Sequence, residues 1–360
     1  MTRAGLHVGL AGVGRIGRFH AETLASLEGV AGITVVDADP ARAAEVAARH
    51  GFRTAEAVEA LVDSGVDALV IATPTDSHAE LIGVAARGGV PAFCEKPVAL
   101  ELERVDAVID EVERAGILVQ IGFQRRFDDG YRAAHEAVRT GALGKLLVLR
   151  AATHDPAPPP EAYISTSGGI FRDLQIHDID AIRLVTGEDV VEVYADGAVR
   201  ETGWFGRYDD VDAAVAVLRL SGGSLAILSG TRRDPLGYDV RLEVFGTEDS
   251  IAVGVDERSP LRSVEPGAAP GASGYRDFID RFGPAYRGEL AAFVEAVRRD
   301  GDSSCSLGDA RAALSAAVAA DASRALRRPI SIAKATGAET VSVTESQHPS
   351  ADQVKERTTP

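Results

Sequence analysis

Asp173, His177 and Asp180 have the residue types and the spacing of an acid–base site. Side chains three and four residues apart lie on one face of an α-helix, so these three are expected to share a face. A neutral imidazole can take the proton of an alcohol, and a carboxylate on its other nitrogen stabilises the imidazolium that forms. We therefore assign His177 as a general base, Asp180 as its partner and Asp173 as a substrate-binding carboxylate. The same pattern also fits a packed helix with a satisfied histidine and solvated carboxylates.

A glycine motif, Gly12-x-Gly14-x-x-Gly17, follows an apolar run and precedes a helical pattern. The first glycine permits a tight turn, the second lets the backbone approach a pyrophosphate, and the third allows close packing of helix on strand. The helix that follows offers unpaired N–H groups and a positive dipole end to phosphates, and Arg15 and Ile16 are expected to lie at the cofactor. A lone glycine pattern can be a mere turn, but the strand before it and the helix after it favour a dinucleotide site.

Asp37 lies twenty residues after Gly17, at the end of the next apolar run. A carboxylate there accepts hydrogen bonds from ribose hydroxyls and repels a 2′-phosphate, which favours NAD over NADP. The alternative is that Asp37 caps the helix after Pro40, a role for which Asp39 competes.

A third segment, Thr73-Pro74-Thr75-Asp76-Ser77-His78, follows the fourth expected strand. Loops at the carboxyl ends of parallel strands face the ligand crevice, so Thr73, Pro74 and His78 are expected to contact the cofactor. Asp76 or Ser77 can equally cap the helix that starts near His78, and the two roles are compatible.

The first 120 residues alternate apolar, β-branched runs with helical patterns. This alternation predicts a doubly wound parallel sheet, a Rossmann domain, over residues 1–122. The expected strands span 6–11, 33–36, 68–72, 92–94 and 118–121, and the expected helices span 18–27, 41–49, 77–87 and 102–115.

After residue 144 the pattern changes to period-two segments with few helices between them, which predicts a large, open, mostly antiparallel sheet. We expect an α+β domain over residues 123–335 that binds substrate and forms the oligomer contact, followed by a disordered tail over 336–360. Helices at 288–299 and 307–326 are expected to pack back on the first domain. Other helical residues are expected at 168–185, and strands at 145–153, 190–199, 212–220, 225–230, 238–245, 250–253 and 330–332.

Composition excludes several classes of protein. The chain has 360 residues, 45% hydrophobic and 26% charged, which is typical of two folded domains, and its net charge of −16 argues against nucleic-acid binding. We find no apolar run near the roughly 20 residues that cross a bilayer, so no membrane association is expected. Two cysteines, Cys94 and Cys305, make no disulfide framework, which favours the cytoplasm. Scattered histidines with no metal-ligand spacing predict no metal site.

Five segments together resemble the glucose–fructose oxidoreductase/inositol dehydrogenase (Gfo/Idh/MocA) family over residues 6–332. Within that family the chain most resembles the myo-inositol 2-dehydrogenases, although His154 stands where arginine is expected in the closest inositol branch. The segments are Cys94-Glu95-Lys96-Pro97 and those at residues 120–128, 155–160, 167–180 and 238–246.

The resemblance implies NAD-dependent oxidation of a secondary hydroxyl of a cyclitol, myo-inositol to 2-keto-myo-inositol (scyllo-inosose). It implies that Glu95 and Lys96 lie at the cofactor and that Lys96 also hydrogen-bonds the reacting oxygen or relays its proton. The alternative for Lys96 is a surface salt bridge with Glu95. Further contacts to the polyol are implied for Arg126, His154, Asp173, His177 and Tyr238.

Several alternatives stay open at this point. Arg126 can pair with Asp128 and Tyr238 can be sheet packing, while Tyr163 is evenly balanced and is left out of the site. The substrate can instead be a pyranose, an anhydrosugar or an aminoglycoside sugar, or the protein can be a non-catalytic, dinucleotide-binding regulator. The open face of the second sheet and the resemblance both favour a homodimer or homotetramer.

Overall fold

The first sheet of the computed structural model, which describes residues 5–267 and 273–332, has six strands in the order β3-β2-β1-β4-β5-β6. All five neighbouring pairs are parallel. The order reverses between β1 and β4, and ligands of such sheets bind outside the carboxyl ends of the strands at that reversal. The strands are β1 (Leu6–Ala11), β2 (Val30–Val36), β3 (Arg53–Thr54), β4 (Ala68–Ile71), β5 (Ala92–Glu95) and β6 (Val119–Gly122).

Five helices connect these strands, and the predicted Rossmann fold is confirmed. Helix α1 begins three residues earlier than expected because Gly14 is its N-cap. The two-residue strand β3 and the one-and-a-half-turn helix α3 were not predicted, since both are too short for a periodic pattern to show. The helices are α1 (Arg15–Ser26), α2 (Pro40–His50), α3 (Val58–Asp63), α4 (Thr75–Arg87) and α5 (Leu102–Ala115).

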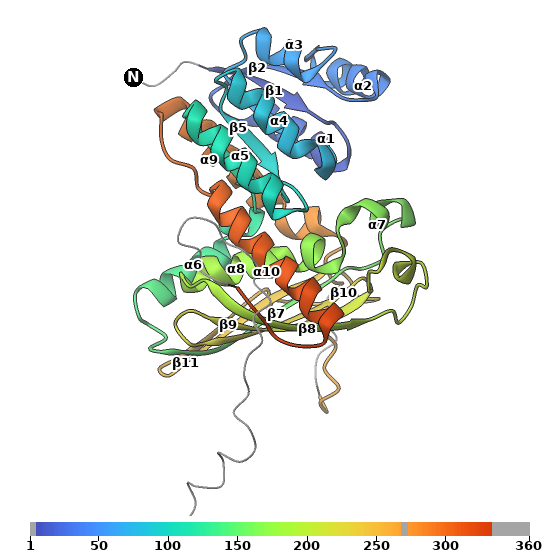
Figure 1. Cartoon of the computed structure of the whole chain (residues 1–360), viewed down its shortest axis with the longest axis vertical. Helices are drawn as coiled ribbons and strands as arrows, with labels where there is room; N and C mark the ends of the chain where they lie inside the picture. Colours follow the sequence, from blue (N-terminus) through green and yellow to red (C-terminus); the bar gives the residue numbers. More distant parts are fainter. Residues whose placement is uncertain (1–4, 268–272, 333–360) are drawn as a thin grey trace, which may run out of the picture.

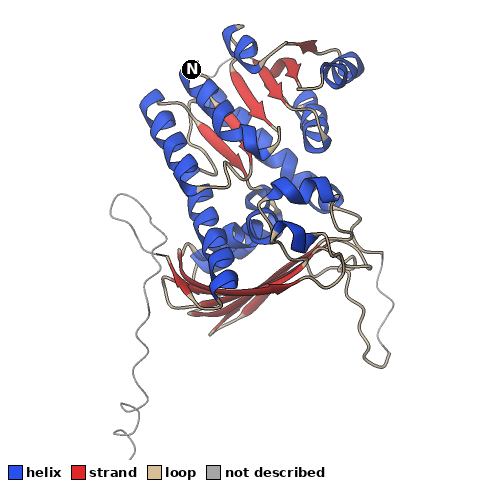
Figure 2. Cartoon of the chain, turned by 45° about the vertical axis from the view of Figure 1, so that its right-hand side comes forward, coloured by secondary structure: helices blue, strands red, loops and turns tan. Residues whose placement is uncertain are grey.

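The second sheet has seven strands in the order β12-β11-β7-β10-β9-β8-β13. Only the pair β7–β10 is parallel, so the predicted, mostly antiparallel sheet is confirmed. Figure 2 shows the helices on one face of this sheet and none of the described helices on the other. The strands are β7 (Leu146–His154), β8 (Val190–Ala198), β9 (Ala213–Leu220), β10 (Leu225–Thr231), β11 (Asp239–Gly246), β12 (Ser250–Val253) and β13 (Ile330–Ser331).

The helical segments of the second half include a π-helical turn, η2, directly before α8. Helix α9 begins ten residues before the expected position, because Asp277 caps its first turn and Pro284 is accommodated inside it. The segments are η1 (Gln124–Phe127), α6 (Asp129–Arg139), α7 (Glu161–Ser167), η2 (Phe171–Gln175), α8 (Ile176–Thr186), η3 (Phe205–Tyr208), α9 (Phe278–Arg299) and α10 (Leu307–Leu326).

Helix α9 returns to the first sheet, whereas α10 runs from α5 of the first half to β8 of the second sheet (Figure 1). Leu290, Phe293, Val294 and Val297 of α9 share a buried cluster with side chains of β1, β2 and β4, and α10 contacts α5 as well as α8. This return packs the two halves of the chain against each other. The domain boundary at residues 122/123 stays a prediction, and the tail at 336–360 lies outside the described residues.

Within the described parts of the chain, no helix combines the length and the apolar character that a membrane span requires.

Candidate active site

The three glycines of the turn provide the sharp turn, the close helix packing and the open side that a dinucleotide site needs. Gly12 has a φ of +87°, and a Cβ there would lie 2.6 Å from the carbonyl oxygen of Ala72. A Cβ on Gly17 would lie 2.0 Å from the carbonyl oxygen of Gly12, so the helix packs too closely for any side chain. A Cβ on Gly14, by contrast, would meet nothing within 4 Å. The open side of this turn is where a pyrophosphate would fit, in front of the N–H groups that begin α1.

Asp37 directly follows the last residue of β2 and lies beside this turn, and its side chain is 5% exposed. Its Oδ2 accepts a hydrogen bond from the N–H of Val13 at 2.8 Å. Its Oδ1 accepts from the N–H of Asp39 at 2.9 Å and from Arg42 at 3.2 Å. Asp39, not Asp37, caps α2, so the capping alternative is wrong for Asp37. A carboxylate has about four lone-pair sites, so Asp37 retains one for a ribose hydroxyl.

Arg15 and Ile16 begin α1 and offer their backbone N–H groups to the same place. The side chain of Arg15 lies elsewhere, because its guanidinium donates to Asp277 at 3.1 Å and stacks 4.5 Å from the ring centre of Phe278. Any contact of Arg15 with the cofactor would therefore come from its backbone.

The loop before α4 differs from what the sequence predicts. Pro74 is the N-cap of α4 and offers no side-chain cap, so neither Asp76 nor Ser77 caps this helix. His78 is 1% exposed, and its ring nitrogens lie 2.8 Å from the carbonyl oxygens of Thr73 and Pro97. With both nitrogens engaged by backbone, the His78 side chain has no polar atom for a cofactor. It ties the loop after β4 to the loop after β5 instead, while Thr73 and Pro74 stay predictions.

Lys96 follows β5 and reaches across to the second half of the chain. Its Nζ donates to the carbonyl oxygen of Asp173 at 2.8 Å and to Oδ1 of the same residue at 3.3 Å. Glu95 instead lies 2.7 Å from His20 Nε2, so the expected alternative of a Lys96–Glu95 salt bridge is wrong. The Lys96–Pro97 peptide bond is cis.

Asp173 is the centre of a buried network of charges. Tyr163 donates to its Oδ1 at 2.7 Å, and Arg232 donates to its Oδ2 at 2.8 Å. Arg232, 2% exposed, also donates to Asp155 at 3.1 Å. Burial alone would raise the pKa of Asp173, but the charges of Lys96 and Arg232 lower it to about 2. Asp173 is therefore ionised across the whole physiological range.

His177 lies on the first turn of α8, half-buried, with its ring edge-to-face on Phe123 at 5.8 Å. Burial, and then the charges of Lys96 and Arg125, hold the pKa of His177 well below its ordinary value. The imidazole is therefore neutral at neutral pH. Within residues 5–267 and 273–332 it has no hydrogen-bond partner, and its Nδ1 is buried. It is free to accept a proton.

The expected His177–Asp180 hydrogen bond is absent from the described structure. Asp180 is 1% exposed, and its carboxylate accepts from Arg126 Nε at 2.9 Å and from Arg126 Nη2 at 2.6 Å. The prediction failed because Arg126, from η1, competes for the carboxylate. Helical spacing places side chains on a face but does not determine which neighbour they bind. Asp180 is thus the anchor of Arg126, and the alternative pairing of Arg126 with Asp128 is also wrong.

The π turn η2 also changes the geometry that the sequence predicted. The interval between Asp173 and His177 crosses from η2 into α8, so it does not follow regular α-helical spacing. Asp173 projects toward Lys96 and Arg232, while His177 lies against Phe123. Asp173 contacts Lys96 directly, and the charge of Lys96 also contributes to the lowered pKa of His177.

His154 and Tyr238 lie beside this network. Nδ1 of His154 is 2.8 Å from Oγ1 of Thr231, and its Nε2 has no hydrogen-bond partner in the described part of the chain. Tyr238 is 6% exposed and packs edge-to-face on Phe282, so it does contribute to packing, and burial raises the pKa of its hydroxyl. Neither observation assigns a substrate contact.

Sequence reasoning missed Arg232 and Asp155 and left Tyr163 undecided. Arg232 follows β10, whose parallel pairing with β7 sets Thr231 opposite His154 and so brings Arg232 beside Asp155. No local pattern marks that register. For Tyr163 the available signal was its place just after the proline-rich loop.

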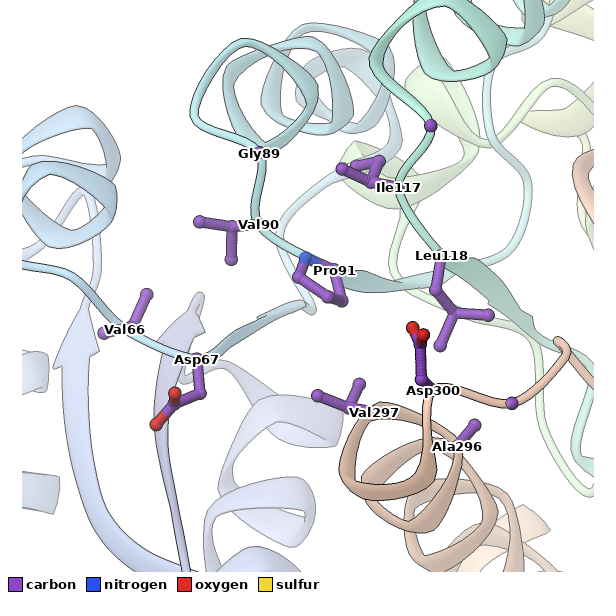
Figure 3. Close-up of a pocket in the computed structure, with 12 residues that line it drawn as sticks. Val66, Asp67, Gly89, Val90, Pro91, Ile117, Leu118, Ala296, Val297 and Asp300 are labelled. Atoms are coloured by element: carbon purple, nitrogen blue, oxygen red, sulfur yellow. The ribbon is translucent and has the colours of Figure 1, made fainter. Parts of the chain in front are cut away.

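A hollow of about 280 Å³ lies at the other edge of the first sheet (Figure 3). It is formed where β4, β5 and β6 begin and where α9 ends, with Asp67 and Asp300 on its wall. Because ligands of such sheets bind at the carboxyl ends of the strands, this hollow is separate from the site of Lys96.

Comparison with known proteins agrees with this geometry. Residues 6–123 match the model of an oxidoreductase family with an NAD-binding Rossmann fold, and residues 131–252 match the Gfo/Idh/MocA C-terminal domain. The chain belongs to the Gfo/Idh/MocA oxidoreductase family. The resemblance inferred from motifs is confirmed, and so are an NAD cofactor and the oxidoreductase class.

Relatives and solved structures extend over almost the whole chain. A myo-inositol 2-dehydrogenase from Thermotoga maritima is 37% identical, over 92% of this chain and 100% of its own. The crystal structure of a putative myo-inositol dehydrogenase from Sinorhizobium meliloti is 36% identical with a TM-score of 0.85, and covers 91% of this chain and 100% of its own. A scyllo-inositol dehydrogenase from Lactobacillus casei, solved with NAD(H) and scyllo-inositol, is 27% identical with a TM-score of 0.82. The match covers 91% of this chain and 99% of its own.

Proposed function

We propose that the protein oxidises a secondary hydroxyl of a cyclitol with NAD, converting myo-inositol to 2-keto-myo-inositol. The observation that carries this proposal is the contact of Lys96 with ionised Asp173 beside a neutral, unpartnered His177, at the carboxyl end of β5. The inositol dehydrogenases among its relatives support a cyclitol as the substrate.

The residues divide the chemistry between them. An ammonium has three donors, and Lys96 uses its contacts with Asp173 to aim a further N–H at the reacting hydroxyl oxygen. His177 takes the hydroxyl proton as the carbon–hydrogen bond breaks, and the ketone forms. NAD, when bound, supplies the acceptor for the hydride. The negative charge of Asp173 offsets the positive charge of Lys96.

Arg126, His154 and Tyr238 are proposed to bind the other hydroxyls of the ring. The guanidinium of Arg126 is oriented by its hydrogen bonds to Asp180, and one ring nitrogen of His154 has no partner among the described residues. A polyol needs many donors and acceptors, and a site that leaves them unpaired rejects analogues that lack a hydroxyl.

A substrate panel tests the proposal. Cyclitols, pyranoses, anhydrosugars and aminoglycoside sugars are each incubated with NAD, and NADH absorbance is followed. We expect myo-inositol to give the highest kcat/KM. A pyranose or an aminoglycoside sugar turned over faster would refute the cyclitol assignment, and NADH binding without turnover of any compound would indicate a regulator.

His177→Ala tests the general base. We expect turnover to fall by about 10²–10⁴ while NAD still binds with unchanged affinity, because His177 acts on the proton rather than on the cofactor. His135→Ala is the matched control, since His135 binds the carbonyl of Leu184 away from the network. Turnover of H177A at the wild-type rate would remove His177 from the mechanism.

We also propose that the bare face of the second sheet contacts a second copy of the chain. Tyr194, Val217 and Ile227 stand opposite one another on neighbouring strands β8, β9 and β10, and all three are more than 40% exposed. An apolar stripe of this kind is typical of subunit contacts. Sedimentation is expected to show a dimer or a tetramer, and a monomer at all concentrations would refute the contact.

A further inference from the structure

Three ionisable side chains meet beneath the strand that leads to Lys96. His20 on α1, Glu95 at the end of β5 and Glu289 on α9 bring one polar atom each to within 4.8 Å of the others. His20 and Glu289 have no exposed surface, and Glu95 is 9% exposed. The cluster therefore joins the cofactor-binding half of the chain to the helix that returns to it.

His20 and Glu95 form the paired half of this cluster. Nε2 of His20 lies 2.7 Å from Oε1 of Glu95, a hydrogen-bond distance. The imidazole is also packed edge-to-face on Phe93 with ring centres 5.7 Å apart. If His20 carried a positive charge, Glu95 would therefore balance it. No positive charge of this pair would then remain to balance a second carboxylate.

Glu289 is the third member of this cluster. Neither of its carboxylate oxygens has a hydrogen-bond partner among the described residues, although both are buried. Among the residues that the structure describes, the titratable groups that face it are His20, Glu95, Tyr286 and Cys305, which include no lysine or arginine. An ionised Glu289 would place a second buried negative charge beside Glu95. Burial, and then the charge of Glu95, raise the pKa of Glu289 well above its ordinary value.

A metal ion is the other occupant that these residue types could hold. Two ligands on one tetrahedral zinc ion, each about 2.1 Å from it, lie roughly 3.4 Å apart. The 2.7 Å separation of His20 Nε2 and Glu95 Oε1 is too short for that arrangement and fits a shared proton. The geometry therefore favours a proton over a metal.

We propose that Glu289 keeps its proton at neutral pH and that the His20–Glu95–Glu289 cluster positions Lys96. Glu95 directly precedes Lys96, so a shift of its carboxylate moves the backbone from which the ammonium extends toward Asp173. An ionised Glu289 would repel Glu95 and disturb that strand end. The role of the cluster toward Lys96 rests on the proposed function, whereas the proton on Glu289 does not.

Infrared spectroscopy tests the proton directly on the full-length protein. Glu289→Gln retains the shape of a neutral acid, and Glu295→Gln is a matched control on the exposed side of the same helix. The difference spectrum of wild type minus E289Q at pH 7 is expected to contain the C=O stretch of a protonated carboxylic acid, and that of wild type minus E295Q is not. Carboxylate bands alone in the E289Q difference would overturn the proposal.

Unfolding equilibria provide a second readout of the proton. Above the ordinary pKa of a glutamic acid the unfolded chain releases the proton that native Glu289 keeps, so wild-type stability falls as pH rises. Between pH 5 and 8 the unfolding constant of wild type is expected to rise up to tenfold per pH unit relative to E289Q. Equal slopes would overturn the proposal, and so would one metal ion per chain in the wild type that E289Q lacks.

Kinetics test the positioning of Lys96. E289Q is expected to keep kcat within about twofold at pH 7, and Glu289→Ala to lower it about tenfold with a smaller change in NAD affinity. E289A with wild-type kcat would overturn the positioning role. Failure of the wild type itself to turn over any cyclitol would instead refute the proposed function and leave the infrared result standing.

Discussion

Arg232→Met removes the guanidinium that bridges Asp155 and Asp173 and leaves the side chain long and apolar. In the folded protein, Lys96 and Arg232 together lower the pKa of Asp173 from 3.8 to about 2 against the effect of burial. At about 1.4 kcal/mol per unit, this shift is worth about 2 kcal/mol in favour of the ionised form. With Arg232 gone, only Lys96 and the hydrogen bond from Tyr163 oppose the effect of burial, so we expect the pKa of Asp173 to rise by about 1–2 units.

The pH dependence of kcat/KM, followed through NADH absorbance, reveals this change. With a pKa of about 2, wild-type Asp173 stays ionised above about pH 3, so its protonation does not contribute to an acid limb at higher pH. In R232M the protonation of Asp173 contributes to the acid limb. At pH values below about 5, kcat/KM is therefore expected to decrease more steeply than in wild type. Arg233→Met is the matched control, because the exposed Arg233 pairs with Glu201 outside the network. Superimposable acid limbs for folded R232M and wild type would refute this reasoning.

The same variant has a consequence for stability. A carboxylate with a depressed native pKa stabilises the protein above its unfolded pKa of about 4, and this contribution is lost as pH falls toward 2. Removing one partner of a buried ion pair typically costs about 3–5 kcal/mol, so R232M is expected to unfold at clearly lower urea concentration at pH 7. Arg232→Lys, which keeps the charge, is expected to lose less.

Other variants have equally direct expectations. Gly17→Ala is expected to lose NAD binding and stability, because its Cβ would lie 2.0 Å from a backbone oxygen. Gly14→Ala is expected to fold but to bind NAD more weakly. Titration of intrinsic fluorescence with NAD measures the binding of both variants. Asp37→Ser is expected to raise kcat/KM for NADP relative to NAD by at least tenfold, and an unchanged ratio would contradict the ribose role. Lys96→Met is expected to lower kcat by about 10²–10⁴, measured at saturating NAD, and to lower thermal stability as well, because it removes a partner of buried Asp173.

The sequence was most informative where chemistry is local. The roles of Gly12, Gly14 and Gly17 follow from turn geometry alone, and the structure shows a positive φ, an open side and a close approach in that order. The β–α alternation likewise specified a parallel sheet, since each strand and helix is long enough to show its own period. In the first domain only β3 and α3 escaped this reasoning, whereas in the second half the helices α6 and α7 were also not predicted.

Pairings between distant elements were not predictable in the same way. The spacing of His177 and Asp180 suggested a hydrogen bond, but Arg126 comes from η1 and takes both carboxylate oxygens. Arg232 enters the network only through the parallel register of β10 on β7, which no local pattern encodes. His78 has the place of a cofactor contact in the chain, yet its ring joins two loops because both neighbouring carbonyl oxygens point at it.

A crystal structure of the protein with NAD and myo-inositol is the most direct test of the central claim. The account predicts one ring hydroxyl within about 3.2 Å of both Lys96 Nζ and a nitrogen of His177, with its carbon facing the nicotinamide. An inositol whose hydroxyl nearest the nicotinamide contacts neither side chain would contradict it.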